Sequence, residues 1–215
     1  MSHETIYRTL FLQARGALKR ELPAYLRTGC QERGRRRTPT ERRGTIPGAV
    51  SIRERPPTVE DRAIPGHWEG DLLIGARQGS SIATLVERST RFVVLVTLAS
   101  RATDHVVQRI QRQLQHLPAA LCQTLTWDRG HEMAAHQAFT VATDIPVYCC
   151  DPQSPWQRGT NESTYGLLRQ CFPKSMDLSR IPQHRLNAVA RELNHRPRAT
   201  LDFCSPAEKF DELLR

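Results

Sequence analysis

The spacing of hydrophobic positions changes along the chain and separates it into short elements. Three apolar segments rich in β-branched residues occupy positions 67–75, 81–89 and 91–99, and turn residues such as Gly79 separate them. Apolar runs of this length between turn residues are typical of β-strands. We therefore predict a three-stranded antiparallel meander that begins near residue 67.

After this meander, strands and helices alternate. Residues 103–117 carry apolar side chains three and four positions apart, which predicts a helix that ends at Pro118. Two further strands and four further helices are predicted by the same reasoning: strands at 123–127 and 145–150, and helices at 131–142, 160–172, 183–195 and 206–214. The order predicts an α/β fold, a mixed sheet flanked by helices. Ribonuclease-H-like enzymes share this order, which narrows the fold without assigning a function.

The N-terminal third has a different pattern. Residues 4–22 have helical spacing, whereas residues 29–48 are rich in Arg, Gly, Pro and Thr and have no apolar period. Such a composition is typical of a linker or a flexible arm. We predict an N-terminal helix and basic linker over 1–65 and a globular core over 66–215.

Charge is concentrated in the same N-terminal third. The chain has a formal net charge of +9, and residues 1–66 contain 14 Lys and Arg against 7 Asp and Glu, compared with 17 against 15 in the remainder. A basic arm beside a nearly neutral core favours a polyanionic partner, most simply nucleic acid. The candidates for following DNA phosphates are Arg35, Arg36 and Arg37; the alternative is a solvated tail that aids solubility.

Two classes of protein are disfavoured by composition. No apolar run approaches the roughly 18–20 residues that a membrane-spanning helix needs. None of the six cysteines has the C-x-x-C spacing of a zinc or redox site. We expect a soluble protein of the cytoplasm.

Three carboxylates occupy positions where side chains from different elements can converge. Asp71 lies inside an apolar strand, Asp128 follows the strand at 123–127, and Glu162 lies in the first turn of a predicted helix. Carboxylate oxygens are the ligands that Mg²⁺ prefers, and a pair of such ions can cleave a phosphodiester. Each residue also has a simpler interpretation as a turn residue, a helix cap or a partner of the helix dipole.

Two other carboxylates are candidates for a supporting role. Glu69 lies two residues before Asp71, so the two side chains share one face of a strand. Glu132 follows Asp128 in the segment DRGHEM, where His131 is an alternative metal or acid contact.

Four more side chains are candidates for DNA contact. Trp156 and Arg158 lie in the loop before Glu162, where they could stack on bases and neutralise phosphate; the alternative for the tryptophan is a plug beneath the loop. Arg169 lies two helical turns after Glu162, on the same helix face. Lys174 is a weaker candidate, because surface lysines are usually only solvated.

The candidate residues lie in segments that together resemble one family. The segments HWEGD, LVERSTRF, LTWDRG, YCCDPQSPWQRGTNE, GLLRQ, FPK and LNHRPRATL, with 33 residues between Asp128 and Glu162, closely resemble the DDE transposases of the insertion-sequence-30 family. Their catalytic core is similar to that of retroviral integrases. The resemblance runs from about residue 2 to residue 213.

This resemblance implies a ribonuclease-H-like fold with Asp71, Asp128 and Glu162 as catalytic metal ligands. It implies two Mg²⁺ ions, with Mn²⁺ able to replace them, and DNA as the partner, at the ends of an insertion element and in the target. Water would cleave a phosphodiester at the element's end, and the freed 3′-hydroxyl would attack target DNA. A homo-oligomer assembled on DNA at the bacterial nucleoid is expected.

The sequence departs from the family in two ways. Family members usually carry an N-terminal helix-turn-helix region that recognises the element ends, and this chain starts at a segment that resembles the one after it. The family helix commonly reads NENTNG, whereas residues 161–166 read NESTYG, with Ser163 and Tyr165 in place of asparagines. Two alternatives therefore remain: a catalytically silent remnant that binds DNA or inhibits the full-length enzyme, and a ribonuclease-H-like nuclease.

Overall fold

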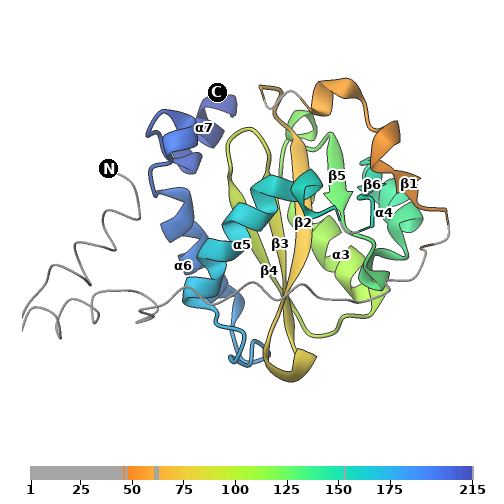
Figure 1. Ribbon diagram of the computed structural model, residues 1–215, viewed down its shortest axis with the longest axis vertical. Helices are drawn as coiled ribbons and strands as arrows, with labels where there is room; N and C mark the ends of the chain where they lie inside the picture. The colour runs from red at the N-terminus through yellow and green to blue at the C-terminus, as the bar shows by residue number, and fades with distance from the viewer. Residues whose placement is uncertain (1–45, 47, 61–62, 153, 215) are drawn as a thin grey trace, which may run out of the picture. The chain divides into compact units, whose positions relative to one another are not determined.

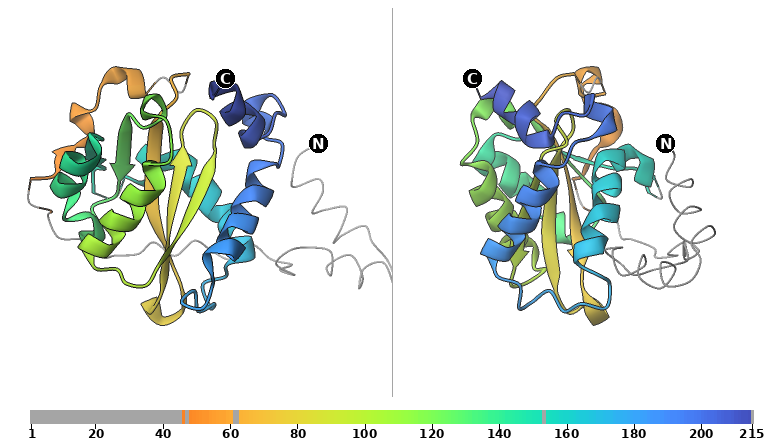
Figure 2. Two further views of the ribbon diagram at one scale, coloured as in Figure 1. Left: turned by 180° about the vertical axis from the view of Figure 1, so that it is seen from behind. Right: turned by 90° about the vertical axis from the view of Figure 1, so that its left-hand side faces the viewer.

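The fold is built around one sheet of six strands. The computed structural model describes residues 46, 48–60, 63–152 and 154–214. The strand order across the sheet is β1-β6-β5-β2-β3-β4. Helices cover both faces of the sheet, as Figure 1 and the edge-on view in Figure 2 show. The predicted mixed sheet flanked by helices is confirmed.

The predicted meander forms one half of this sheet. Strands β2 (His67–Ile74), β3 (Ser81–Glu87) and β4 (Val93–Leu98) pair antiparallel in sequence order. Strand β3 is buried along its whole length, which explains why its sequence reads as a continuous apolar run without alternation.

The other half of the sheet is parallel. Strands β5 (Thr124–Trp127) and β6 (Val147–Cys149) extend the sheet from β2, and β1 (Val50–Ser51) pairs with β6 at the edge. Strand β1 lies inside the range that we assigned to the linker. Two residues are too few for an apolar period, so sequence reasoning had no signal for this strand.

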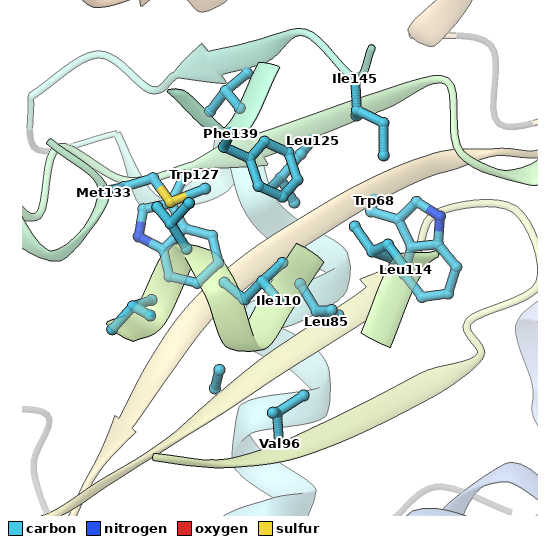
Figure 3. Packing of buried hydrophobic residues seen from close by; sticks show 14 of the residues in the cluster. Trp68, Leu85, Val96, Ile110, Leu114, Leu125, Trp127, Met133, Phe139 and Ile145 are labelled. Carbon is cyan, nitrogen blue, oxygen red and sulfur yellow. The ribbon is translucent and has the colours of Figure 1, made fainter. Parts of the chain in front are cut away.

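One face of the sheet carries an apolar core. Helix α3 (Thr103–Leu114) and helix α4 (His136–Thr143) lie over it, and Figure 3 shows Trp68 and Trp127 among the aliphatic side chains of this cluster. Helix α7 (Pro206–Leu213) adds Phe210, whose ring meets that of Trp68 edge to face.

The opposite face carries helix α5 (Gly159–Cys171), which crosses β2 and β3 in Figure 1. A second apolar cluster joins α5 to helix α6 (Gln183–Asn194) and to β4. The amide groups of Gln183 and Asn194 also pair with backbone groups of β4. Side chains of helix α6 therefore form hydrogen bonds with backbone groups of β4, an edge strand whose peptide groups would otherwise be unpaired.

The helices predicted after residue 100 are present with small differences in length. The segment predicted as a helix at 131–142 is a 3-10 turn at His131–Met133 followed by α4, and the loop at 151–159 contains a 3-10 turn at Pro155–Arg158. Other 3-10 turns are Ile52–Glu54, Pro57–Val59, Ala76–Gln78, Ala119–Leu121 and Ala199–Leu201. The helix predicted at 4–22 lies outside the described residues. Within the described residues, no helix has the length and apolar character to cross a bilayer.

Candidate active site

The pairing of β2 with β5 brings two of the predicted metal ligands together. Glu69 lies opposite Thr126 in this parallel pair, so Asp71 and Asp128 stand two residues further along the same register. Alternation along the strands directs both carboxylates to the face that carries α5. One oxygen of each is held by a nearby backbone N–H: Leu72 donates to Asp71 at 2.8 Å, and Gly130 donates to Asp128 at 2.9 Å.

A guanidinium group lies between these two carboxylates. Arg158 Nη1 is 2.9 Å from Asp71 Oδ2, and its Nη2 is 3.7 Å from Asp128 Oδ2. Nη1 also donates to the carbonyl of Gly70 at 3.0 Å. Burial lowers the pKa of Arg158, but the charges of Asp71 and Asp128 outweigh it and raise this pKa above its usual range. Arg158, predicted as a DNA contact, is thus the counter-ion of the aspartate pair in this structure.

The electrostatics of Asp71 show that the two aspartates are near enough to repel. Burial is the largest influence and raises the pKa of Asp71, Arg158 opposes it, and the negative charge of Asp128 raises this pKa further. The net shift is upward. Two carboxylates that share one site behave in this way when no metal neutralises them.

Helix α5 starts directly beside the aspartate pair. Asn161 N donates to Glu69 Oε2 at 2.8 Å, and the Asn161 amide donates to the Glu69 carbonyl at 2.9 Å. Glu162, the next residue, is half-buried in the first turn of α5. Within the described parts of the chain, no three His, Cys, Asp or Glu side chains form a cluster ready to hold a metal ion. The structure therefore joins Asp71 and Asp128 and places Glu162 at the start of α5, without gathering all three carboxylates.

Glu69 connects the strand to this helix. Its side chain is completely buried, and Arg88 Nη1 lies 3.1 Å from its Oε1 in a buried ion pair. Arg88 and Asn161 were not predicted from the sequence. The sequence does contain a feature that points to Arg88. A glutamate buried inside an apolar strand requires a positively charged partner, and Arg88 directly follows the neighbouring strand β3.

Glu132 lies on the other side of Asp128. Trp127 Nε1 donates to Glu132 Oε1 at 3.3 Å. Burial, and next the charge of Asp128, raise the pKa of Glu132. Glu132 therefore lies near enough to Asp128 for their charges to interact, whereas His131 is exposed.

The remaining predicted DNA contacts differ in their surroundings. The side chain of Trp156 is 71% exposed, so the interpretation as a plug beneath the loop is wrong. Lys174 is also exposed. Arg169 is tied to the protein, because it donates to the Ile74 carbonyl at 2.9 Å and lies over the ring of Tyr165. Arg35, Arg36 and Arg37 lie outside the described residues.

The aspartate pair fits a divalent cation. A positive group already lies between Asp71 and Asp128, so the two carboxylates converge on one cationic position. Carboxylate oxygens are hard donors suited to Mg²⁺ or a similar ion. Such an ion and the Arg158 guanidinium would compete for the same oxygens.

Comparison with known proteins agrees with the fold and the sequence pattern. Residues 61–155 match the family model described as integrase core domain, a range that contains Asp71 and Asp128. The catalytic core domain of BIV integrase superposes with a TM-score of 0.51 at 17% identity, covering 68% of this chain and 94% of that one. This likeness confirms the ribonuclease-H-like fold.

Two curated relatives with high identity are transposases of insertion elements. The transposase for insertion sequence element IS1086 of Cupriavidus metallidurans is 49% identical over 214 residues, which is 100% of this chain and 63% of that protein. The transposase InsI for insertion sequence element IS30A of Escherichia coli is 47% identical over 211 residues, covering 97% of this chain and 55% of that protein. This chain thus spans about three fifths of the length of these relatives. With these matches and the shared motifs, the chain is similar over nearly its whole length to transposases of the insertion-sequence-30 family.

Proposed function

We propose that this chain is a transposase catalytic domain that cleaves and joins DNA strands at the ends of an insertion element with the help of divalent metal ions. The observation that carries the proposal is the pairing of Asp71 with Asp128 around a positive group. A structural ion pair needs one carboxylate, whereas two carboxylates that converge on one cation are suited to metal chemistry.

Each residue has a distinct part in this proposal. Asp71 and Asp128 would hold metal from the sheet, and Glu162 would add a ligand from the first turn of α5. Bound ions, Mg²⁺ in the cell and Mn²⁺ as a substitute, would activate the attacking water or 3′-hydroxyl and stabilise the leaving oxygen. Glu69 positions α5 through Asn161, and therefore sets where Glu162 can reach.

Movement of one side chain is required before metal can bind. The Arg158 guanidinium occupies the carboxylate oxygens that a metal would take, so it has to leave them. Once released, it remains beside the scissile position, where a guanidinium can neutralise a DNA phosphate. Arg158 would thus reach its predicted role in DNA contact only after this rearrangement.

DNA would approach the exposed side of the α5 start. Trp156 presents an aromatic face there for stacking on a base, and Lys174, just beyond the C-terminal end of α5, presents a charge to the backbone farther along. Copies of the chain would assemble on DNA, because an insertion element has two ends and one active site would act at each end.

A strand-joining assay tests this function. Purified protein is incubated with pre-nicked IS30-type element ends, target DNA and Mg²⁺ or Mn²⁺, and joined products are measured. Asp71→Asn and Asp128→Asn should each lower joining by at least about a thousandfold, the scale expected when the main electrostatic groups of a site are removed. Asp104→Asn, an exposed carboxylate in α3 on the opposite face, should retain joining.

The outcomes separate the alternatives. Joining that the Asp128→Asn change abolishes supports the transposase. DNA binding without joining in any variant would instead identify a silent remnant, and metal-dependent cleavage of RNA–DNA hybrids would identify a ribonuclease-H-like nuclease.

A further inference from the structure

A pocket lies on the flank of α5 opposite the aspartate pair. It has a volume of about 320 Å³ and is lined by residues of α5, by Arg91 in the turn between β3 and β4, and by Arg198 and Thr200 after α6. None of its described lining residues is acidic. We call it the arginine pocket.

The arginine pocket concentrates positive charge. Arg198 is half-buried, and its pKa is lowered first by burial and then by the charges of Arg196 and Arg91. The guanidinium groups therefore lie close enough to repel one another. The repulsion between like charges at a pocket decreases when an anion binds between them.

Two donors at this pocket have no partner within the described structure. The Thr160 hydroxyl is completely buried and unpaired, and so is Arg198 Nε. Neighbouring hydroxyls are already committed: Ser163 donates to the Gly159 carbonyl at 2.8 Å, and Thr164 donates to the Thr160 carbonyl at 3.0 Å. The Nε atoms of Arg88, Arg158 and Arg169 are also unpaired among the described residues, so the Thr160 hydroxyl, a completely buried donor at the pocket, is the more specific sign of an acceptor that a ligand would supply.

We propose that the arginine pocket binds a phosphodiester of the DNA backbone. A phosphate offers several acceptor oxygens and a negative charge, which matches a guanidinium pair and an unpaired hydroxyl. This inference rests on the proposed function, because that function supplies DNA as the phosphate source.

The position of the pocket on α5 explains how one DNA strand could use both sites. Thr160, Ser163, Thr164 and Leu167 recur at helical spacing on one flank, whereas Arg158 and Glu162 lie on the other. The width of a helix is about 10 Å, a distance that a few consecutive phosphates of one DNA strand span. A strand crossing the first turn of α5 would place one phosphate at the aspartate pair and another in the arginine pocket.

Fluorescence anisotropy with a labelled 30-base-pair duplex in EDTA tests the proposal. Arg198→Gln should lower DNA affinity about tenfold and reduce the slope of log affinity against log salt by about one, the signature of a lost phosphate contact. Thr160→Val, which keeps the buried shape and removes the hydroxyl, should lower affinity about threefold and leave the slope unchanged. Arg112→Gln on α3 removes the same charge from an exposed position on the opposite face and should change neither quantity.

Several outcomes would overturn this proposal. Equal effects of Arg198→Gln and Arg112→Gln would show only a loss of overall charge. Wild-type affinity in a folded Thr160→Val variant would show that the hydroxyl meets no phosphate. Calorimetric titration with inorganic phosphate distinguishes the sources: phosphate binding lost in Arg198→Gln while DNA affinity stays unchanged would assign the pocket to free phosphate. Because no metal or joining step enters these measurements, failure of the strand-joining assay leaves their result intact.

Discussion

The two faces of β2 illustrate how one strand serves stability on one side and chemistry on the other. Trp68 and Leu72 enter the apolar cluster under α3, whereas Glu69 and Asp71, one residue away from each, face the start of α5. Gly70 between them has no room for a side chain, since a Cβ would lie 2.1 Å from the ring of Trp127. The apolar face is stabilised mainly by packing, whereas the polar face depends on ion pairs and hydrogen bonds to particular partners.

The largest loss of folding stability is expected from a change on the apolar face of β2. Trp68→Ala removes a completely buried ring and its 2.7 Å hydrogen bond to the Leu121 carbonyl, so the free energy of unfolding should fall by about 3–5 kcal/mol. Chemical denaturation measures the loss. Joining by the fraction that stays folded should change little, and a severe loss of joining in fully folded protein would argue against the separation of the two faces.

Changes at Glu69 should affect stability and activity in different ways. Glu69→Met leaves Arg88 buried without its counter-ion and should lower the free energy of unfolding by about 3 kcal/mol. The double change Glu69→Met with Arg88→Met replaces the pair by apolar groups and should recover most of that loss. Joining should not recover, because Asn161 N still lacks its carboxylate acceptor. A double variant that regains both properties would show that Glu69 does not position α5.

Arg158 offers a measurement of metal binding that is independent of catalysis. Arg158→Gln removes the counter-ion of Asp71 and Asp128 and should destabilise the metal-free protein by about 2 kcal/mol. Divalent ions should then raise the melting temperature of this variant more than that of the wild type, since no guanidinium competes for the carboxylates. Thermal unfolding with and without Mn²⁺ provides the test. An equal rise in both proteins would mean that metal and Arg158 do not share a site.

The smallest effect expected is on pH dependence. The pKa of Asp71 is raised in the folded protein, so this group binds more protons when folded than when unfolded. Metal-free stability should therefore fall as pH rises from the ordinary aspartate pKa to the raised value, and by less than in the variants above. Asp71→Asn should flatten this part of a plot of unfolding free energy against pH, whereas Asp104→Asn should not. An unchanged profile in Asp71→Asn would argue against a raised pKa of Asp71, whose main cause is burial.

Much of the fold followed from local pattern. The meander, the alternation of strands and helices and the boundaries of α3, α5 and α6 could be predicted, because the period of apolar residues reports which face of each element is buried. Strand β1 could not, since two residues carry no period and their pairing with β6 is a contact between distant segments.

The candidate active site likewise has a part that the sequence predicted and a part that only the tertiary structure determined. Sequence alone identified Asp71, Asp128 and Glu162 as candidates, through their places at strand and helix ends and through family motifs. It could not reveal that Arg158 would lie between the aspartates, that Asn161 would fasten α5 to Glu69, or that two arginines would share a pocket. Those relations join residues that lie far apart in the chain, and local spacing carries no information about which of them meet. Only the pairing of β2 with β5, and the packing of α5 across the sheet, decided where these charges came together.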